Sequence, residues 1–581
     1  IKSMASKKSL LGGINVKVQG MSGFDKSHYN AFTAPLGAIV PMCKQLLLPG
    51  KAKLSVKISA SLPPLASDAF LRTHLKVEAF LVPLRLCYGG FQSWFSGEKI
   101  ASASGNSPLY VASLPRLKYQ GAYTDSGGSS HSLVQTRVDY NFGPHSLMDY
   151  FNVKYPMSNG SVISPSWMEP QISGYKNFSY FNIFPFLAYQ LCYHHWYRNK
   201  LIERPLFSPP DLQSNPAFYQ PFVLPYVSFS GIHDYIVDLT ASGTSTVTLL
   251  NGSLNELRYR NYGYDYFTTA LPSAQDGSPM SVDTSSGSFT ISSLRSANAL
   301  QHFAEVNQLS GPDYIQTLRA RYNRAPSSLV AQRPVLIGSA DFPMFTSGVE
   351  QSAPFDSSSQ QTGNPFEGLG ARFGRAHAEG SDFVCETDVD EPCYLMVMCS
   401  LVPEANYAVG VAHDMRIFTG VGSITDLPCS ELERVGLEPV YTQEVGSDDS
   451  GVPDNADGSR AWSVFGYQPR YMWHKAGQHN EVHGLFRLGA SLQSFIPQRL
   501  GIQGVLPSQI NTAFLKVQPG DLDNVTAVSG SISQYGVMVD SAISLFVSEP
   551  LGESVMPSLV DPGAEHGQSV YLSRGGISVN E

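Results

Sequence analysis

Charged side chains are scarce in this chain of 581 residues. Lys, Arg, Asp and Glu together make up 15% of it, whereas the aromatic residues reach 11%. Soluble domains usually carry about a quarter charged residues, and the cores of protein–protein interfaces are depleted of charge and enriched in Tyr and Phe. The composition therefore indicates a protein that hides much of its surface against partners. The alternative is a loop-rich β protein with an unusually neutral surface.

Cysteine is sparse as well, and its spacing is irregular. The chain has seven cysteines, an odd number, and none of them forms a C-x-x-C pair. This is not the pattern of a disulfide framework. We expect free thiols that pack as small hydrophobic side chains, in a chain that folds in a reducing compartment. The seven are Cys43, Cys87, Cys192, Cys385, Cys393, Cys399 and Cys429.

Long hydrophobic runs are absent too. No stretch of eighteen apolar residues occurs, which excludes a transmembrane helix. The opening IKSMASKKSLLGG lacks the apolar core of a secretory signal peptide, and the absence of Met at position 1 is consistent with missing or processed leading residues. From these features we expect no membrane insertion and assembly in a cytoplasm.

The sequence also lacks the motifs of common catalytic and nucleotide-binding sites. It contains no G-x-S-x-G elbow, no Walker A motif, no H-E-x-x-H and no G-x-G-x-x-G that opens a helix after a strand. Paired carboxylates for glycoside hydrolysis have a spatial signature, which a sequence leaves open. We therefore expect a protein that is not an enzyme, with no cofactor and no assigned catalytic residue.

Two groups of polar residues come nearest to a metal site. His474, His479 and His483 are spaced by five and four residues, which matches no common zinc pattern, so we expect interface or loop histidines. The stretch 382–391 lacks the Asp/Gly spacing of a calcium loop, and we interpret it as a solvated strand edge that resists edge-to-edge pairing. Its five carboxylates are Asp382, Glu386, Asp388, Asp390 and Glu391.

Strand patterns dominate what is present. In residues 51–60, Leu54, Val56 and Ile58 alternate with polar residues, which is typical of a half-buried strand. The early and late strands lie far apart in sequence, as the sheets of a jelly-roll require. The predicted strands are 36–48, 51–60, 74–86, 393–402, 410–418 and 536–548.

Helices are few and connections are long. Residues 186–199 have aromatic residues at helical spacing, and 293–323 reads as two helices parted by Gly311-Pro312. We expect their apolar stripes to face the core. Ser, Gly, Asn, Asp and Pro are abundant in long segments that a compact enzyme seldom needs, whereas a shell subunit uses such loops for contacts. These predicted loop segments are 96–180, 203–290, 346–380 and 440–460.

Positive charge is concentrated at the start of the chain. Residues 1–60 contain nine Lys and one acid, Asp25, a net charge of +8, so the rest of a chain whose total is −9 carries −17. A basic arm on an acidic body indicates a polyanion on one side only. The alternative is a solvated tail with ordinary lysines at strand edges.

Seven segments of the chain carry distinctive motifs. They are FDKSHYNAFTAPLGAIVPMCKQLLLPG (24–50), THLKVEAFLVPLRLCYGGFQSWFSGE (73–98), HSLMDYFNV (145–153), FPFLAYQLCYHHWYRNK (184–200), DYFTTALPSAQDG (265–277), TISSLRSANALQHFAEV (290–306) and FGYQPRYMWHKAGQHNEVHGLFR (465–487). Their motifs include a Ser-His segment with a V-P and an L-P-G turn, a strand with a Pro-x-Arg turn, a Trp-containing helix, the D-Y-F-T and T-I-x-x-L-R elements, and F-G-Y-Q-x-R-Y. Together, and in this order, they resemble the major capsid proteins of the microviruses, small bacteriophages with circular single-stranded DNA, and especially their gokushovirus-like branch.

The resemblance implies an all-β fold, a single viral jelly-roll that is an eight-stranded antiparallel β-sandwich with long inserted loops and a few short helices. Residues 1–35 would form a basic arm and 36–581 the capsid domain. Many copies would close a small icosahedral (T=1) shell in the host bacterium's cytoplasm and remain in the virion around the DNA. The other implied partners are DNA-pilot and scaffolding proteins and a host cell-surface receptor.

The arm would contact the genome in this setting. Its lysines would neutralise phosphates non-specifically, in a manner that weakens with salt, and nearby aromatic side chains would stack on unpaired bases. The lysines that we expect to do so are Lys2, Lys7, Lys8, Lys17 and Lys26.

The chain departs from the gokushovirus pattern at one place. That branch carries a long insertion between the D-Y-F-T and T-I-x-x-L-R elements, which builds a protrusion at the threefold axes, but here only residues 278–289 separate the two. We therefore expect another loop to decorate the shell. A competing hypothesis is a secreted β-sandwich that binds or hydrolyses carbohydrate, since aromatic residues and Ser/Gly loops suit sugar stacking. The absent signal peptide and the odd cysteine number argue against it.

Overall fold

The computed structural model describes the sandwich and the segments that pack on it. Short strand segments between the main ranges are described as well. The main described ranges are 21–87, 144–153, 178–203, 256–273, 332–350, 372–415, 437–446, 463–475, 479–499, 508–527 and 535–551.

One sheet, here called the open sheet, has six strands and is antiparallel throughout. Its order is β1-β23-β4-β17-β16, and β2 lies beside β1 along the same edge of β23. Ser22 lies opposite Glu549 and His28 opposite Ile543, so β1 and β2 keep one register. They therefore act as a single edge strand with a short interruption. The bounds are β1 Ser22–Asp25, β2 His28–Ala34, β4 Gly50–Ser61, β16 Phe345–Glu350, β17 Arg372–Val389 and β23 Val537–Glu549.

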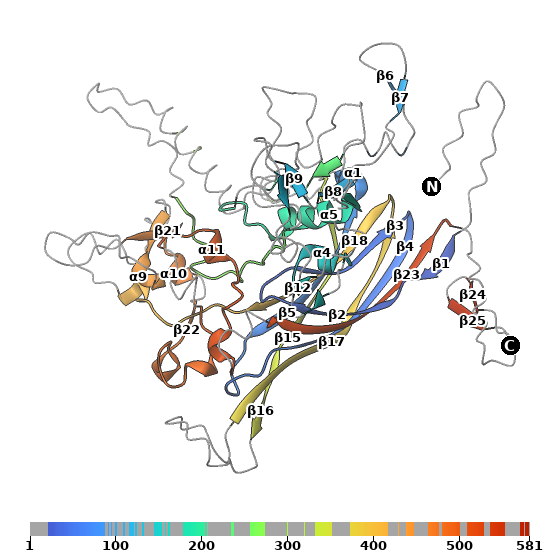
Figure 1. The fold of residues 1–581 in the computed structure, drawn as a ribbon. Helices are drawn as coiled ribbons and strands as arrows, with labels where there is room; N and C mark the ends of the chain where they lie inside the picture. The colour runs from blue at the N-terminus through green and yellow to red at the C-terminus, as the bar shows by residue number, and fades with distance from the viewer. Residues whose placement is uncertain are drawn as a thin grey trace, which may run out of the picture.

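The other main sheet, here called the covered sheet, has four antiparallel strands in the order β15-β5-β18-β3. It pairs strands from the start of the chain with strands some 300 residues later, as in the register of Cys399 opposite Val77. Figure 1 shows this sheet lying against the open sheet. The bounds are β3 Val40–Leu47, β5 Thr73–Pro83, β15 Val335–Pro343 and β18 Cys393–Pro403.

The molecule has three layers here, and the burial of each strand follows from its layer. The main core lies between the sheets, and a second core lies between the covered sheet and short helices. Strand β18 is buried at every position, whereas β4 and β23 alternate between buried and outward-facing residues. A strand covered on both faces requires a continuous apolar run such as CYLMVMCSLV. The helices are α1 Leu84–Cys87, α4 Leu147–Tyr150 and α5 Phe184–Cys192, which continues as the π-helical turn η1 Tyr193–Tyr197.

The remaining elements are short. A second group, with α9, α10 and α11, lies at one side of the sandwich in Figure 1. The short strands are β6 Lys99–Ala101, β7 Pro108–Tyr110, β8 Arg116–Gln120, β9 Ala122–Thr124, β10 Ser130–Ser132, β11 Met157–Ser158, β12 Ser161–Val162, β13 Phe178–Asn182, β14 Asp234–Ile236, β19 Asn406–Tyr407, β20 Leu437–Tyr441, β21 Val464–Pro469, β22 Asn480–Glu481, β24 Val570–Ser573 and β25 Gly576–Val579. The short helices are η4 His413–Met415, α9 Thr442–Val445, α10 Met472–Lys475, η6 Gly484–Phe486, η7 Gln493–Phe495, α11 Thr512–Leu515 and η8 Asp523–Val525.

The predicted all-β class is confirmed, and so are most of the predicted elements. Strands β3, β4, β5, β18 and β23 lie within or close to the ranges expected for them, and the helix expected at 186–199 is α5 with η1. The six described cysteines are free and buried, as expected. Burial raises the pKa of the Cys43, Cys393 and Cys399 thiols to about 12, so they are packed groups without nucleophilic character.

Two predictions need correction. The strand expected at 410–418 is wrong, because its described part contains the 3-10 helix η4, which begins at His413. His413 Nδ1 lies 3.1 Å from Glu444 Oε2, and this contact belongs to a turn and not to a sheet ladder. The segment 346–380, expected as a loop, contains most of β16 and the first half of β17. The two helices expected in 293–323 lie almost wholly outside the described residues.

Close approach of neighbouring segments explains why the glycine-containing sequence of β17 is typical of a loop although the segment is a strand. A side chain at Gly374 would meet the Ser67 carbonyl oxygen at 1.9 Å, and one at Gly380 would meet the Phe342 ring at 2.1 Å. Glycine in a strand marks a site where another segment approaches. The glycines that suggest a flexible loop in the sequence are therefore required by packing.

Candidate functional site

The outer face of the open sheet carries the lysines of strand β4. Lys51, Lys53 and Lys57 alternate with buried residues, and all three are exposed. Because successive side chains of a strand point to opposite faces, these amino groups share one surface. Three of the five described lysines among the first sixty residues therefore present their charge here.

Acidic side chains stand on the same surface. Glu386 lies opposite Lys53, and Asp388 lies opposite Lys51 with 3.8 Å between its Oδ1 and the lysine Nζ. Asp540 on β23 is exposed as well. An ion pair between side chains this exposed adds little to stability. A polyanion would therefore meet both signs of charge, and this face by itself is not a strong phosphate-binding surface.

Lys26 is bound within the fold. Its Nζ lies 3.2 Å from Glu549 Oε2, and it also donates a hydrogen bond to the Leu46 carbonyl oxygen at 3.5 Å. The Glu549 side chain is 3% exposed and accepts a further hydrogen bond from the Leu48 amide at 3.1 Å. The pair fastens the edge strand to the end of β23 and to the turn after β3. The positive charge of Lys26 is thus compensated inside the protein.

The other lysines near the start of the chain divide into two groups. Lys2, Lys7, Lys8 and Lys17 lie outside the described residues, so their contact with nucleic acid stays a prediction. Lys44 lies 4.9 Å above the Phe151 ring, and burial lowers its pKa to about 8. Lys44 is therefore part of the packing between the covered sheet and α4.

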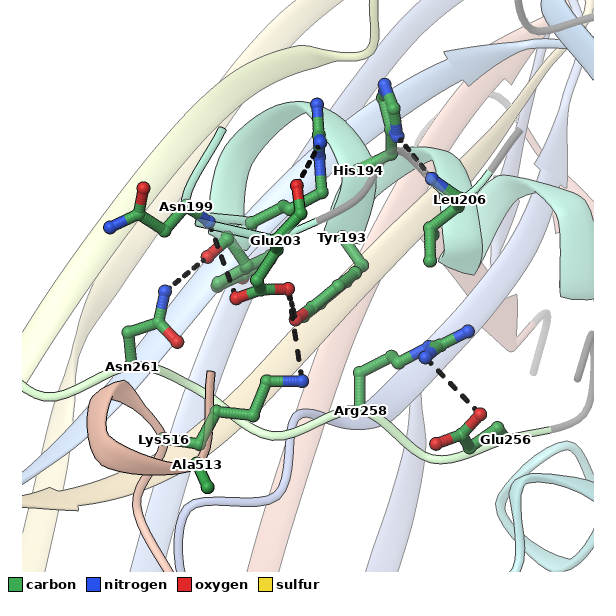
Figure 2. A network of polar contacts seen from close by, with 12 residues as sticks. Tyr193, His194, Asn199, Glu203, Leu206, Glu256, Arg258, Asn261, Ala513 and Lys516 are labelled. Carbon is green, nitrogen blue, oxygen red and sulfur yellow. Dashed lines mark hydrogen bonds and ion pairs between the residues drawn. The ribbon is translucent and has the colours of Figure 1, made fainter. Parts of the chain in front are cut away.

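A buried polar network, drawn in Figure 2, joins the end of η1 to two distant segments. The carboxylate of Glu203 accepts a hydrogen bond from the Tyr193 hydroxyl at 2.6 Å and lies 3.9 Å from Lys516 Nζ. Its side chain is completely buried. Burial lowers the pKa of Lys516, and the Glu203 carboxylate opposes that effect. Arg258 lies over the Tyr193 ring at 5.5 Å and 3.3 Å from Glu256, so the network neutralises charge that the core would not otherwise accept.

His194 lies next to this network and is kept neutral. It is 2% exposed, and its Nδ1 accepts a hydrogen bond from the Leu206 amide at 3.4 Å. Burial lowers its pKa from 6.5 to about 2, and the nearby positive groups of His195, Arg198 and Lys200 add to that shift. In the unfolded chain the same imidazole takes up a proton below about pH 6.5. The folded form therefore loses stability as the pH falls below that value.

Replacing His194 with Gln should flatten this pH dependence. Between pH 6.5 and pH 5 the wild-type free energy of unfolding should fall by about 1.7 kcal/mol more than that of H194Q, because the unfolded imidazole is half protonated at pH 6.5 and the slope approaches about 1.4 kcal/mol per pH unit only below that. Gln keeps an acceptor for the Leu206 amide but does not titrate. Urea unfolding at pH 7, 6 and 5 measures the difference between the two slopes. Parallel slopes would show that His194 accepts a proton in the folded protein.

A second buried cation holds the segments around residues 260 and 515 together. Arg499 lies 3.8 Å from the Phe514 ring centre and 4.5 Å from that of Tyr262, and it donates a hydrogen bond to the Tyr407 hydroxyl at 2.8 Å. That hydroxyl donates in turn to Asp265 at 2.9 Å. Phe514 is 15 positions from Arg499 in the sequence, and the other partners are 92 to 237 positions away. No local motif therefore indicates the cluster.

The histidines and acids singled out in the sequence have ordinary partners. His479 lies 3.3 Å and His483 3.1 Å from the two carboxylate oxygens of Glu481. Within the part of the chain that the structure describes, no group of three or more His, Cys, Asp or Glu side chains could hold a metal ion. The acidic stretch lies at the end of β17, where β4 pairs with it on one side while β16 reaches only as far as His377. The interpretation as a strand edge fits Asp382, Glu386 and Asp388, which lie on β17. It does not fit Asp390 and Glu391, which follow the strand, and Glu391 is paired with Arg85 at 2.8 Å.

An exposed apolar loop lies at one end of the sandwich. Leu485 and Phe70 are 60% and 62% exposed, and the Phe70 ring lies 6.4 Å from both Phe486 and Phe495. The loop backbone is held by Gln498 Nε2, which donates to the Phe486 carbonyl oxygen at 2.7 Å. Such exposed apolar surface is typical of protein contact sites.

None of the helices described is long and apolar enough to span a membrane.

Known proteins match the chain over most of its length. The model of a family described as "Capsid protein (F protein)" matches residues 251–552, which include strands β15 to β23. The capsid protein VP1 of Chlamydia phage 1 is 25% identical over 528 residues, which cover 81% of this chain and 85% of that protein. These matches confirm the resemblance to microvirus capsid proteins that the sequence motifs indicate.

Proposed function

Because the chain belongs to the capsid protein (F protein) family, we propose that it is the subunit of a small icosahedral (T=1) shell that encloses a circular single-stranded DNA genome. The match over more than half of the chain carries this proposal. The low charge content supports it, since closed symmetry requires contacts on several faces of each subunit. The role is structural, without catalysis.

The strand order supports a more specific proposal for the fold, the viral jelly-roll. That architecture has eight strands in two packed sheets, built from two Greek keys. Here the edge strand β1–β2, β23, β4 and β17 form one set of four, and β3, β18, β5 and β15 form the other. Strands β2, β3, β4 and β5 alternate between the sheets in chain order, as do β17, β18 and β23. Strand β16 is an addition at the edge.

The chain's organisation is proposed to follow from this role. Residues 1–35 would include the basic arm, although β1 and β2 place the last part of that range in the open sheet. Residues 36–581 would form one jelly-roll domain with long loops. Lys2, Lys7, Lys8 and Lys17 would neutralise genome phosphates on the inside of the shell. Lys26 would take no part in this, because its charge is paired with that of Glu549.

Further partners and places follow from the same proposal. The shell would assemble in the cytoplasm of the bacterial host and remain in the virion. DNA-pilot and scaffolding proteins would bind subunits during assembly, and the outer loops would contact a host cell-surface receptor. The exposed loop around Leu485 supports such contacts with proteins.

Electron microscopy tests the central proposal. The full chain, expressed alone and with its source's other virion proteins, should form closed particles of uniform size with icosahedral symmetry. A chain that remains monomeric under all assembly conditions, together with source particles that lack it, would overturn the proposal. A glycosidase screen with saturable turnover would favour the carbohydrate-active alternative.

A further inference from the structure

A groove lies on the outer face of the open sheet beside helix α4. Its volume is about 560 Å³, enough for several residues of a peptide. The floor comes from outward-facing positions of β2, β4 and β23, and α4 with its flanking residues forms one side. The lining residues are Asn30, Ala31, Phe32, Thr33, Ser59, Ser61, Asp149, Tyr150, Asn152, Met538, Val539 and Asp540.

The groove is open because most of the side chains on its floor are small. Ala31 and Thr33 stand on β2, and Ser59 and Ser61 stand two strands away on β4, all at positions that alternate with partly or fully buried residues. Met538 and Asp540 on β23 lie between the two pairs in the register. A sheet face with larger side chains at these positions would be filled. The hollow therefore results from the sequence of three strands that the chain brings together only by folding.

The side formed by α4 is fixed in place. The Tyr150 hydroxyl donates a hydrogen bond to the Thr33 carbonyl oxygen at 2.7 Å, and the Tyr150 and Phe32 rings are in edge contact at 6.1 Å. His145 Nε2 lies 2.8 Å from the Thr33 hydroxyl. His145 and Asn152, on either side of the helix, both have positive φ, 66° and 61°. A groove held this firmly loses little conformational entropy when it binds a ligand.

The charge of the groove is negative. Asp149 and Asp540 are among the lining residues, and Glu379 on β17 lies across Ser59 from Asp540. The described lining contains neither Lys nor Arg. Met538, 46% exposed, and the Tyr150 ring add apolar surface. The complementary ligand is an extended peptide that carries several cations and some apolar side chains, with no acid.

The N-terminal segment of this protein has that composition. Residues 1–20 contain Lys2, Lys7, Lys8 and Lys17, no acidic residue, and apolar residues between the lysines. We propose that a stretch of several residues within 1–20 of one copy, with one or more of its lysines, binds in the groove of a neighbouring copy. The inference rests on the proposed function, because it requires many copies in contact.

Chain geometry places Lys17 in the groove of a neighbour and not in that of its own chain. The edge strand begins at Ser22, opposite Glu549, and runs toward the groove, so the preceding residues leave the sheet at its far end. Asp540 is nine residues from Glu549 along β23, about 30 Å at 3.4 Å per residue. Lys17 is five residues from Ser22 and reaches about 18 Å when fully extended. Lys17 therefore cannot reach the groove of its own chain and can enter only that of a neighbour, whereas Lys2, Lys7 and Lys8 are fourteen or more residues from Ser22 and have the length, about 49 Å or more, to reach either groove.

The groove and the genome would bind the same lysines. A lysine that binds a genome phosphate is not available to the groove. In a shell without DNA the lysines are therefore free to occupy the groove. DNA-free particles are therefore the sample in which the contact is measured.

Mixed cross-linking tests the proposal. Subunits that carry Asp540→Cys are co-assembled with size-tagged subunits that carry Cys in place of Lys2, Lys7, Lys8 or Lys17, one at a time, and are mildly oxidised. At least one pair should give a disulfide-linked dimer of mixed size. The matched control replaces Asp540→Cys with Lys53→Cys, an exposed position on the same sheet face outside the groove, and should give at least fivefold less dimer.

The outcomes separate this inference from the proposed function. Closed particles in which none of the four pairs exceeds the Lys53 control would overturn the docking of the arm and leave the shell proposal intact. A further sample carries Asp540→Cys and one of the lysine substitutions in the same chain. A disulfide that forms within such chains, with none between the co-assembled single variants, would overturn the assignment to a neighbouring copy. Failure of the wild-type chain to form particles contradicts the proposed function itself.

Discussion

Replacing Glu203 with Ala is expected to lower the free energy of unfolding by about 3–5 kcal/mol, because it leaves a buried cation without its counter-charge. Lys516 Nζ lies 3.9 Å from Glu203 Oε2, with side-chain exposures of 17% and 0%. The Tyr193 hydroxyl would also lose its acceptor at 2.6 Å. Urea denaturation of the unassembled subunit at pH 7 measures this change in the free energy of unfolding.

Two further variants show that the charge causes the effect. Glu203→Gln keeps a hydrogen-bond acceptor for Tyr193 and should destabilise less than Glu203→Ala. Adding Lys516→Met to Glu203→Ala removes the unpaired cation, so the double variant should recover at least 1 kcal/mol relative to Glu203→Ala. A double variant whose loss is the sum of the two single losses would show that Glu203 and Lys516 do not interact.

Replacing Lys2, Lys7, Lys8 and Lys17 with Ser is expected to reduce the DNA retained in closed particles. Each lysine that neutralises a phosphate of a single strand contributes about 0.7 to the slope of log affinity against log salt. Four such lysines should together remove about three units from that slope. Binding of a single-stranded oligonucleotide at several salt concentrations, and the DNA content of purified particles, measure the two effects.

Lys26 supplies the matched control for that experiment. It belongs to the same basic stretch but is paired with Glu549. Lys26→Ser should therefore lower the stability of the subunit while leaving the salt slope unchanged. If the four-lysine variant and Lys26→Ser changed the slope equally per lysine, the arm would have no special role and the assignment of the DNA contacts would be wrong.

The sheets were largely predictable because their strands carry local patterns. Residues 51–60 alternate since one face of β4 is exposed, and 393–402 is continuously apolar since β18 is buried on both faces. The long β17 escaped prediction because its glycines serve close packing against Ser67 and Phe342. At 410–418 the sequence GVAHDMRIF suggested a strand, but the contact of His413 with Glu444 holds a turn there. The local pattern of apolar and polar residues therefore predicts secondary structure where burial determines the conformation. It fails where a residue distant in the sequence determines it.

The functional surfaces were less accessible to sequence reasoning. A cluster of lysines is visible in the sequence, but whether each lysine is free depends on a residue such as Glu549, 523 positions from Lys26. The groove is defined by Ala31, Ser59 and Asp540, which have no common motif and meet only through strand register. Charge composition therefore indicated a polyanion partner, while the position of the acidic groove required the folded sheet.

The pairing of β4 with β23 has a consequence for how the protein is made. A ribosome that synthesises about 5–20 residues per second needs on the order of half a minute to two minutes for a chain of 581 residues. Through most of that time residues 22–61 have been translated while their partner, Val537–Glu549, has not. A nascent or prematurely terminated chain cannot complete the open sheet. Only a subunit translated nearly to its end can then present both the edge strand and the groove, so incomplete chains are excluded from assembly without a separate proofreading step.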